Sequence, residues 1–444
     1  MNPAYLTLFK DVWARSKIYR GILIATGIYA AIRLIAHLLT LSDFFYPDDL
    51  RIYLEAAEAF RQHNVLYPTL PLEAMEFFQY APSFALAFVP FTWLGRIPAA
   101  ILHSAIHIVI YVLMYLSWDR IFGHLGQKRA QEMLIWTLPV WLVFSAFWSD
   151  MAFLNVYMMM ALLATLLIKA IFCERLWLSV LWLSIILQIK PQWAFAALIP
   201  LLLGRYRFFF SLIGLSIAAY ITVIGLTGLI AGPYGFEQYR AYLHLMTNIS
   251  GTYPWRGPSE PFLGYNHSIV QIFVYLFGIT PRVLLVARIA KLAMLIPLAI
   301  VCLRLFLKQV GRAEDALPQV GLDVAFALYT GAFIWLDVVW EMSLGIALFT
   351  YLLATPEKRG VKALIWIVFL PYALVDFFQL VSYGLLGDDA FVGAYLIGDP
   401  SIYLPLVMIA IAFTHYLLVS RLWVKIPHVA EHPLTPQKQV AASQ

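Results

Sequence analysis

The chain has 444 residues, of which 62% are hydrophobic and only 12% are charged, and its mean hydropathy is +0.79. Soluble proteins carry about 25% charged residues, so this composition excludes a soluble globular domain. It predicts an all-α, polytopic integral membrane protein. The net charge of +5 requires no nucleic-acid partner, because Lys and Arg gather in short loops between apolar runs, as is typical of cytoplasmic loops beside anionic lipid.

The first apolar run, residues 21–41, follows four basic residues, which places the N-terminus in the cytoplasm. An acidic and aromatic segment comes next. Within it, residues 50–62 alternate apolar and polar side chains at helical spacing. We expect this amphipathic helix to lie flat on the membrane.

Basic loops lie on the cytoplasmic side of a membrane, and this rule predicts which of the other apolar segments cross it. Residues 81–95 and 268–278 are short, and only if both are re-entrant do all the basic loops fall in the cytoplasm. About twelve spans remain, and both termini are then cytoplasmic. The predicted spans are 21–41, 99–116, 134–148, 152–171, 176–187, 193–203, 208–230, 283–306, 323–336, 343–353, 363–381 and 402–422.

This topology predicts one transmembrane domain over residues 1–426. Its two large outer loops, 42–96 and 231–280, hold most of the unusual polar residues and are expected to form the site. The polar residues 427–444 are expected to be a disordered cytoplasmic tail. The protein is thus expected in the cytoplasmic membrane, with its active site facing outside.

Two carboxylates, Asp48 and Asp49, stand at the start of the predicted surface helix. One interpretation is purely structural, because acids cap helix N-termini and favour the helix dipole. The other keeps Asp48 as the cap and lets Asp49 face a cavity. A carboxylate at the edge of lipid is partly desolvated, which would make Asp49 a better base.

Lys190 and Pro191 stand at the predicted outer end of the 176–187 hairpin. Either the ammonium reaches the lipid headgroups, or Lys190 faces inward and holds an anionic group. Tyr80, which precedes Ala81 and Pro82, by itself indicates only a helix start.

Arg256 lies in a Trp-Arg-Gly-Pro loop, and its guanidinium suits a phosphate. For Asn266 the favoured interpretation is a cap for the short helix that begins near Ser268. Asp337, Trp340 and Glu341 form a group that either lines a sugar site or makes a hydrated turn. No metal-binding motif, P-loop or nucleophile elbow is present, so no metal and no cofactor are expected.

Several short motifs in the same order resemble glycosyltransferase family 87, a family of GT-C-type enzymes that use polyprenyl-phosphate mannose. The motifs are Asp49-Leu50-Arg51-Ile52-Tyr53, Ala56-Ala57, Leu66-Tyr67, Phe78-Gln79-Tyr80-Ala81-Pro82 with Pro90, Lys190-Pro191, Gly204-Arg205-Tyr206-Arg207 and Asn266-His267-Ser268. The chain departs from the family pattern in two places. It has Ala152-Phe153-Leu154-Asn155 for Gly-Gln-x-Asn, and Met342 where a His often follows a late Trp.

The resemblance implies a GT-C-type fold and an acidic general base in the first outer loop, which is Asp49 here, with Asp48 as its rival. Residues expected to bind substrate are Lys190, Arg256, Tyr80, Asn155, Asn266, His267, Trp340 and Glu341. The expected partners are a polyprenyl-phosphate-sugar donor lipid, a glycan, glycolipid or protein acceptor, and membrane lipids.

The predicted function is therefore inverting transfer of a hexose, with mannose favoured, outside the cytoplasmic membrane. A transporter or flippase of lipid-linked sugars is the alternative, although such proteins usually show paired repeats that this sequence lacks. A non-catalytic subunit of an envelope assembly complex is a third hypothesis.

Overall fold

A computed structural model describes residues 3–41, 48–68, 77–259, 266–307, 316–355, 358–386 and 400–430. Within these ranges the chain is helical and contains no β-strand. The first helices are α1 (Pro3–Arg15), α2 (Lys17–Thr40), α3 (Asp48–Arg61), α4 (Pro82–Thr92), α5 (Arg96–His124), α6 (Lys128–Trp136), α7 (Leu138–Val143), α8 (Ser145–Phe153), α9 (Tyr157–Phe172) and α10 (Leu176–Ile189).

A short 3-10 helix, η1, follows α10. It is followed by ten more α-helices. Their bounds are η1 (Pro191–Leu198), α11 (Ile199–Leu202), α12 (Tyr206–Ala231), α13 (Pro233–Thr252), α14 (Ile269–Phe277), α15 (Pro281–Leu307), α16 (Ala316–Trp335), α17 (Gly345–Ala354), α18 (Arg359–Ala373), α19 (Val375–Leu386) and α20 (Pro400–Ala430).

Five described helices are long and apolar enough to cross a membrane, namely α2, α5, α12, α15 and residues Leu406–Ile426 of α20. The number rises to seven if each of two bent helix pairs counts as one span. The other predicted spans coincide with shorter apolar helices. For example, α9 and α17 are 16 and 10 residues long, or about 24 and 15 Å, against a hydrocarbon core of about 30 Å.

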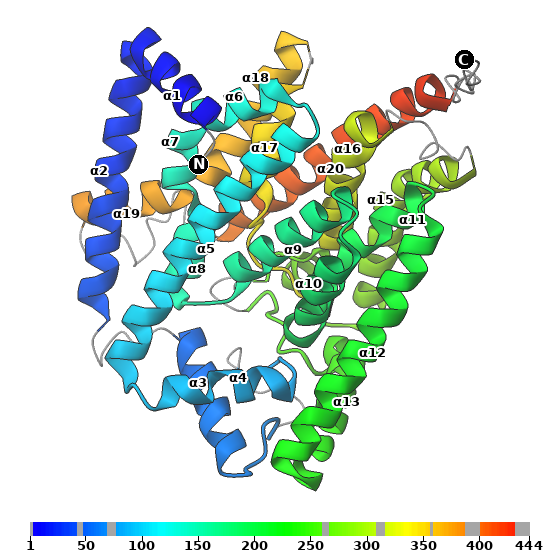
Figure 1. Ribbon diagram of the computed structural model, residues 1–444. Helices are drawn as coiled ribbons and strands as arrows, with labels where there is room; N and C mark the ends of the chain where they lie inside the picture. The colour runs from blue at the N-terminus through cyan, green and yellow to red at the C-terminus, as the bar shows by residue number, and fades with distance from the viewer. Residues whose placement is uncertain are drawn as a thin grey trace, which may run out of the picture.

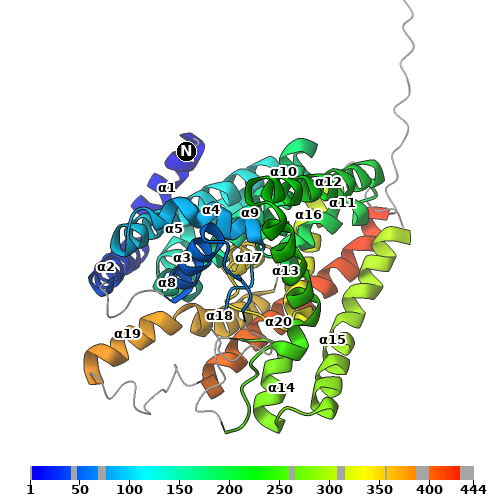
Figure 2. The ribbon, with the colours of Figure 1, turned by 90° about the horizontal axis from the view of Figure 1, so that it is seen from below.

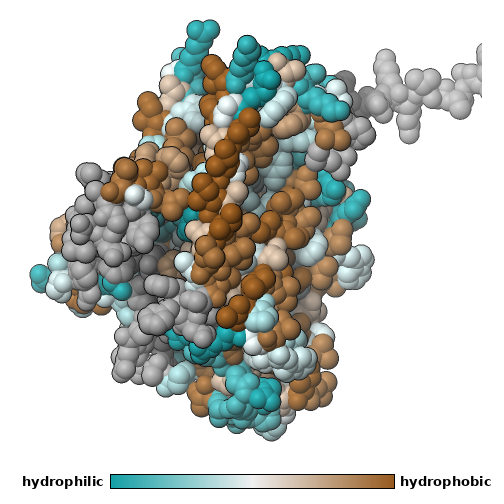
Figure 3. Space-filling model, turned by 90° about the vertical axis from the view of Figure 1, so that its left-hand side faces the viewer, coloured by the Kyte–Doolittle hydropathy of each residue, from teal (hydrophilic) through white to brown (hydrophobic). Residues whose placement is uncertain are grey.

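Apolar side chains dominate the middle of the molecular face shown in Figure 3, and hydrophilic side chains gather toward both ends. Helices α2, α12 and α15 contribute to the apolar exterior, because only about a tenth of the most hydrophobic window of each is buried in the protein. Exposed apolar side chains arranged in this way are suited to lipid. The chain is a multi-pass membrane protein.

Two predicted spans are broken. The span 363–381 bends by 50° between α18 and α19, and the span 134–148 is divided further. Residues 134–148 were expected to form a single helix, but α6, α7 and α8 share this stretch and the path bends by 52° after Trp136. Pro139, near the start of α7, lacks the N–H that a continuous helix would use. A second break precedes α8, where Phe144 adopts extended backbone angles.

The second outer loop is not a loop throughout. Residues 231–266 were expected to be irregular, but 20 of them form α13, which packs against α12. Gly232 joins the two helices with a φ of 64°, a backbone conformation that glycine adopts without steric cost. The polar pattern of α13 hides its helix from a search for apolar periodicity.

Helix α3 confirms the predicted amphipathic helix, but its apolar face does not lie on lipid. Leu50, Tyr53, Ala57 and Phe60 are buried, and α3 packs against α4. The two predicted re-entrant segments are indeed short helices, since α4 and α14 have 11 and 9 residues.

Helices α3, α4 and α13 lie together at one end of the molecule, opposite α1, α6 and α18 (Figure 1). Viewed from the α3 end, α15 stands at the edge of the molecule, backed by α16 and α20 (Figure 2). Helix α20 continues to Ala430, four residues into the predicted tail, and residues 431–444 lie outside the described ranges.

Candidate active site

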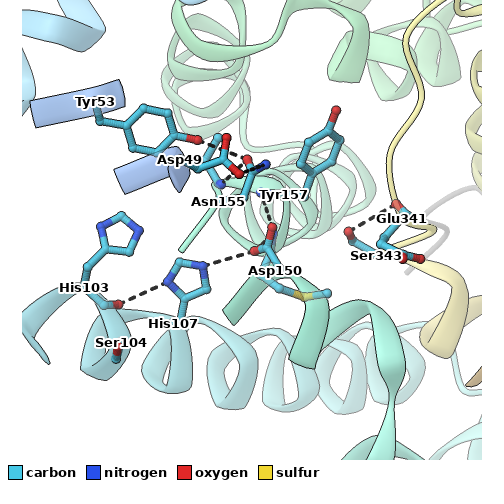
Figure 4. A network of polar contacts seen from close by, with 12 residues as sticks. Asp49, Tyr53, His103, Ser104, His107, Asp150, Asn155, Tyr157, Glu341 and Ser343 are labelled. Atoms are coloured by element: carbon cyan, nitrogen blue, oxygen red, sulfur yellow. Dashed lines mark hydrogen bonds and ion pairs between the residues drawn. The ribbon is translucent and has the colours of Figure 1, made fainter. Parts of the chain in front are cut away.

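Asp49 projects from the first turn of α3 toward the junction of α8 and α9. Its carboxylate accepts a hydrogen bond of 2.8 Å from the side-chain amide of Asn155 (Figure 4). The amide oxygen of Asn155 in turn accepts bonds from the Tyr53 hydroxyl at 3.1 Å and from the Val156 N–H at 2.7 Å. These two donors fix the orientation of the amide, so its NH₂ group points at Asp49.

The turn that presents Asn155 is strained. Leu154 has a φ of 50° and a ψ of 44°, the left-handed conformation that non-glycine residues rarely adopt. Such a residue costs on the order of 1–3 kcal/mol and persists where the surrounding structure enforces it. Here the enforcing contact is local, because the Asn155 N–H donates to the Asp150 carbonyl oxygen at 3.0 Å.

The N-terminus of α9 is held by Asp150, which is completely buried. Its two carboxylate oxygens accept the N–H groups of Tyr157 and Met158, at 3.1 and 2.8 Å. His107 on α5 places Nε2 3.1 Å from Asp150 and Nδ1 3.1 Å from the His103 carbonyl oxygen (Figure 4). His107 therefore links α5 to the carboxylate that holds the N-terminus of α9.

Two buried tyrosines complete the wall beside Asn155. The hydroxyl groups of Tyr53 and Tyr80 are 3.0 Å apart, and their rings meet edge to face. Burial raises the pKa of Tyr80 well above that of free tyrosine, and the charge of Asp49 adds to the shift. Tyr80 therefore stays neutral and can donate a hydrogen bond.

Lys190 lies in the break between α10 and η1 and is only 2% exposed. Its ammonium group is 4.2 Å from the ring centroid of Tyr157 and 4.8 Å from that of Tyr80. Burial lowers the pKa of Lys190, while the negative charges of Asp49 and Asp150 oppose that shift. Lys190 therefore faces inward rather than toward the headgroups, as one of the two sequence interpretations required.

The late outer segment joins the same region through Trp340. Its ring stacks on Tyr157 with centroids 6.0 Å apart, and Glu341 follows in a buried position. The Tyr372 hydroxyl donates to Glu341 at 2.8 Å, and His267 Nε2 lies 3.9 Å from the other carboxylate oxygen. Burial lowers the pKa of His267 to about 3, so this histidine is neutral at neutral pH.

Asn266 does not cap the short helix α14. The cap is Ser268, whose hydroxyl accepts the Gln271 N–H at 3.1 Å. Asn266 instead links two outer segments, because its side chain accepts from the Ser268 and Val339 N–H groups and donates to the Asp337 carbonyl oxygen. Asn266 therefore positions the segment that carries Trp340 and Glu341.

A cavity of about 370 Å³ adjoins Lys190. Two basic residues of α15, Arg288 and Lys291, line it together with Asp337. Sequence reasoning missed both basic residues, although charges within a predicted span are a recognised signal of function. Arg256 is not among the described residues that line the cavity. Its backbone N–H and carbonyl oxygen form hydrogen bonds with the side chain of Gln271.

Asp48 is the first residue of α3, and its side chain lies outside the described part of the structure. In the part of the chain that is described, no group of three or more His, Cys, Asp or Glu residues is arranged to hold a metal ion. The structure brings Asp49, Asn155, Tyr80 and Lys190 together, and Tyr157, Asp150 and His107 join them.

This arrangement has a carboxylate that can accept a proton and a buried ammonium that can stabilise an anion. Among curated proteins none matches the chain. A family model, Glycosyltransferase family 87, matches residues 78–330, which include Asn155 and Lys190 but neither Asp49 nor Trp340. That match covers more than half of the 444 residues, and it places the chain in glycosyltransferase family 87.

Proposed function

We propose that this glycosyltransferase moves a hexose, with mannose the expected sugar, from a polyprenyl-phosphate donor to a glycan, glycolipid or protein acceptor. The observation that carries the proposal is the half-buried Asp49 carboxylate, held by Asn155 near enough to the buried Lys190 ammonium for their charges to interact. A base and an anion-binding cation are the two groups that such a transfer needs.

The chemistry proceeds by direct displacement. Asp49 takes the proton of the acceptor hydroxyl as its oxygen bonds to C1 of the sugar. The bond from C1 to the phosphate oxygen breaks, and the electron pair leaves with the lipid phosphate. Attack opposite the leaving group inverts the anomeric centre. Lys190 stabilises the negative charge that develops on the phosphate. The low dielectric constant of the buried site makes this stabilisation stronger than in water.

The same proposal includes a GT-C-type fold of about twelve spans and a site outside the cytoplasmic membrane. Its support is the distribution of charge. Lys128 and Arg129 begin α6, and Arg359 and Lys362 lie in the first turn of α18, at the end of the molecule opposite α3 and α4 (Figure 1). Basic residues mark the cytoplasmic side of membrane proteins. Asp49 on α3 then faces outside.

The test is a transfer assay with the purified full-length chain in nanodiscs. The donor is polyprenyl-phosphate mannose with radiolabelled sugar, and the acceptor is an extract of membrane glycolipids. Asp49→Asn is expected to lower transfer at least a hundredfold, because it removes the proton acceptor. Glu55→Gln is the matched control, since Glu55 is an exposed acid of the same helix.

Full activity of Asp49→Asn would remove Asp49 from the mechanism. Polyprenyl-phosphate glucose and polyprenyl-phosphate arabinose, tested as donors in parallel, decide the sugar. Movement of a lipid-linked sugar across a liposome membrane without bond formation would instead establish the transporter alternative and overturn the proposal.

A further inference from the structure

The cavity beside Lys190 is unusually basic for a space between membrane helices. Lys190, Arg288 and Lys291 line it, against one lining carboxylate, that of Asp337. Lys190 and Lys291 are both nearly inaccessible, at 2% and 4% exposure. Two buried cations beside an exposed third repel each other, and buried charges of this kind mark places where an anion is bound.

Lys291 has a partner among the lining residues. Its ammonium group forms an ion pair with the Asp337 carboxylate and lies 5.3 Å from the ring centroid of Trp335. The Lys291 side chain is 5% exposed, whereas that of Asp337 is 25% exposed. Asp337 can therefore turn toward water while its backbone stays fixed, because its carbonyl oxygen accepts the Asn266 amide at 2.9 Å.

The mouth of the cavity reaches the lipid-facing side of α15. Arg288 is exposed, and Leu292, one turn along, lines the cavity and is 53% exposed. Ile289 and Ile296 on the same helix are also more than half exposed. On the other wall stand Met246 and Ile249 of α13. A ligand that fits has an anionic group for the interior and a long apolar chain that leaves along α15.

We infer that Arg288 and Lys291 bind the phosphate of a polyprenyl-phosphate lipid, and that Asp337 takes the place of that phosphate on Lys291 when the cavity is empty. This inference rests on the proposed function and identifies the donor end of the site. The phosphate displaces Asp337 from Lys291, and Asp337 returns when the spent lipid leaves.

The charge balance fits the reaction. A sugar phosphodiester carries one negative charge, and cleavage of the C1–O bond leaves a phosphate monoester that carries up to two, while the acceptor proton passes to Asp49. Among the described lining residues, three cations and one carboxylate give an excess of two positive charges, and the excess becomes three when Asp337 turns away. The cations therefore favour the charge that develops as the bond breaks.

The experiment measures equilibrium binding of radiolabelled polyprenyl monophosphate to the full-length chain in nanodiscs of zwitterionic lipid. Arg288→Gln and Lys291→Gln are each expected to weaken binding at least tenfold. Asp337→Asn is expected to strengthen it severalfold, because the internal competitor is gone. Arg282→Gln is the matched control: it makes the same charge change on α15, at an exposed residue that is not among the described lining residues.

Arg288 is exposed, so its substitution tests the inference even if Lys291→Gln does not fold. Unchanged affinity in Arg288→Gln would overturn the inference. So would equal competition by phosphatidylglycerol, which would make the cavity a general anionic-lipid site, or equal competition by inorganic phosphate or by uncharged polyprenol.

The two proposals fail separately. Asp49→Asn is expected to lose transfer and keep its affinity for polyprenyl monophosphate. If lipid binding depends on Arg288 but the chain forms no glycosidic bond, the inferred phosphate site is supported and the proposed transferase activity is refuted. Transfer by Arg288→Gln with an unchanged donor KM would do the reverse.

Discussion

The side-chain amide of Asn155 donates to the carboxylate of Asp49 across 106 positions of sequence, at 2.8 Å. This bond joins the first outer helix to the strained turn between α8 and α9. Because the amide oxygen is occupied by Tyr53 and by the Val156 N–H, Asn155 has one orientation and so does the carboxylate that it holds.

Asn155→Ala is therefore expected to reduce kcat by about tenfold to a hundredfold, since a mispositioned base loses much of the gain that general-base catalysis gives. Donor KM should change much less. Initial-rate kinetics on the purified chain check this. Asn248→Ala, at an exposed asparagine of α13, is the control. A loss confined to KM would show that Asn155 binds substrate rather than positioning Asp49.

A second prediction concerns pH. Burial lowers the pKa of Lys190 below the 10.5 of a free lysine, and the ammonium is present only below the lowered pKa. Burial lowers this pKa to about 8, so transfer activity is expected to fall as the pH rises through about 8, earlier than an ordinary lysine would allow. Lys190→Arg keeps its charge over this range and should lose that alkaline decline, while Lys190→Gln should be impaired at every pH. An identical alkaline limb in Lys190→Arg would assign the decline to another group.

The sequence predicted the part of the site that depends on local pattern. Asp49 follows from the start of an amphipathic helix, and Lys190 follows from a motif that resembles the family. Asn155 is the residue that the chain keeps where it otherwise departs from Gly-Gln-x-Asn. Helix α13 was missed because its exposed polar side chains give no clear apolar stripe. The break at α7 was missed because the apolar composition of residues 134–148 is typical of a continuous span. Composition does not take into account that Pro139 has no N–H for a helical hydrogen bond.

Arg288 and Lys291 were missed for a different reason. They stand in a helix that is apolar enough to be an ordinary span, and their significance depends on Asp337, 46 positions after Lys291. No local pattern encodes a contact of that range. Asn266 was misjudged in the same way, because its partners at Asp337 and Val339 come from a distant segment, whereas Ser268 satisfies the helix end locally.

A third prediction tests the support beneath Asn155. Asp150 accepts three donors, and an asparagine would turn an NH₂ group toward one of them. Asp150→Asn is expected to lower the free energy of unfolding by about 2–3 kcal/mol and to reduce transfer. Chemical denaturation in detergent measures the loss. Asp119→Asn, at a buried acid of α5 whose carboxylate accepts from Gln131, is the control and should lose less. Equal losses of unfolding free energy in the two variants would mean that the Asp150 cap of α9 stabilises the fold no more than an ordinary buried acid does.

The last prediction separates the two buried acids of the site. Glu341 accepts the Tyr372 hydroxyl, and an amide oxygen can accept the same bond, so Glu341→Gln keeps the local packing. His267 is neutral beside it, so no ion pair is lost at neutral pH. If Glu341 binds a sugar hydroxyl, its neutral form should raise donor KM about tenfold and leave kcat within a few-fold. Asp49→Asn should show the opposite pattern, with kcat abolished and donor binding kept. A hundredfold fall in kcat for Glu341→Gln at unchanged KM, together with an active Asp49→Asn, would move the role of base from Asp49 to Glu341, because that pattern marks an interaction made in the transition state.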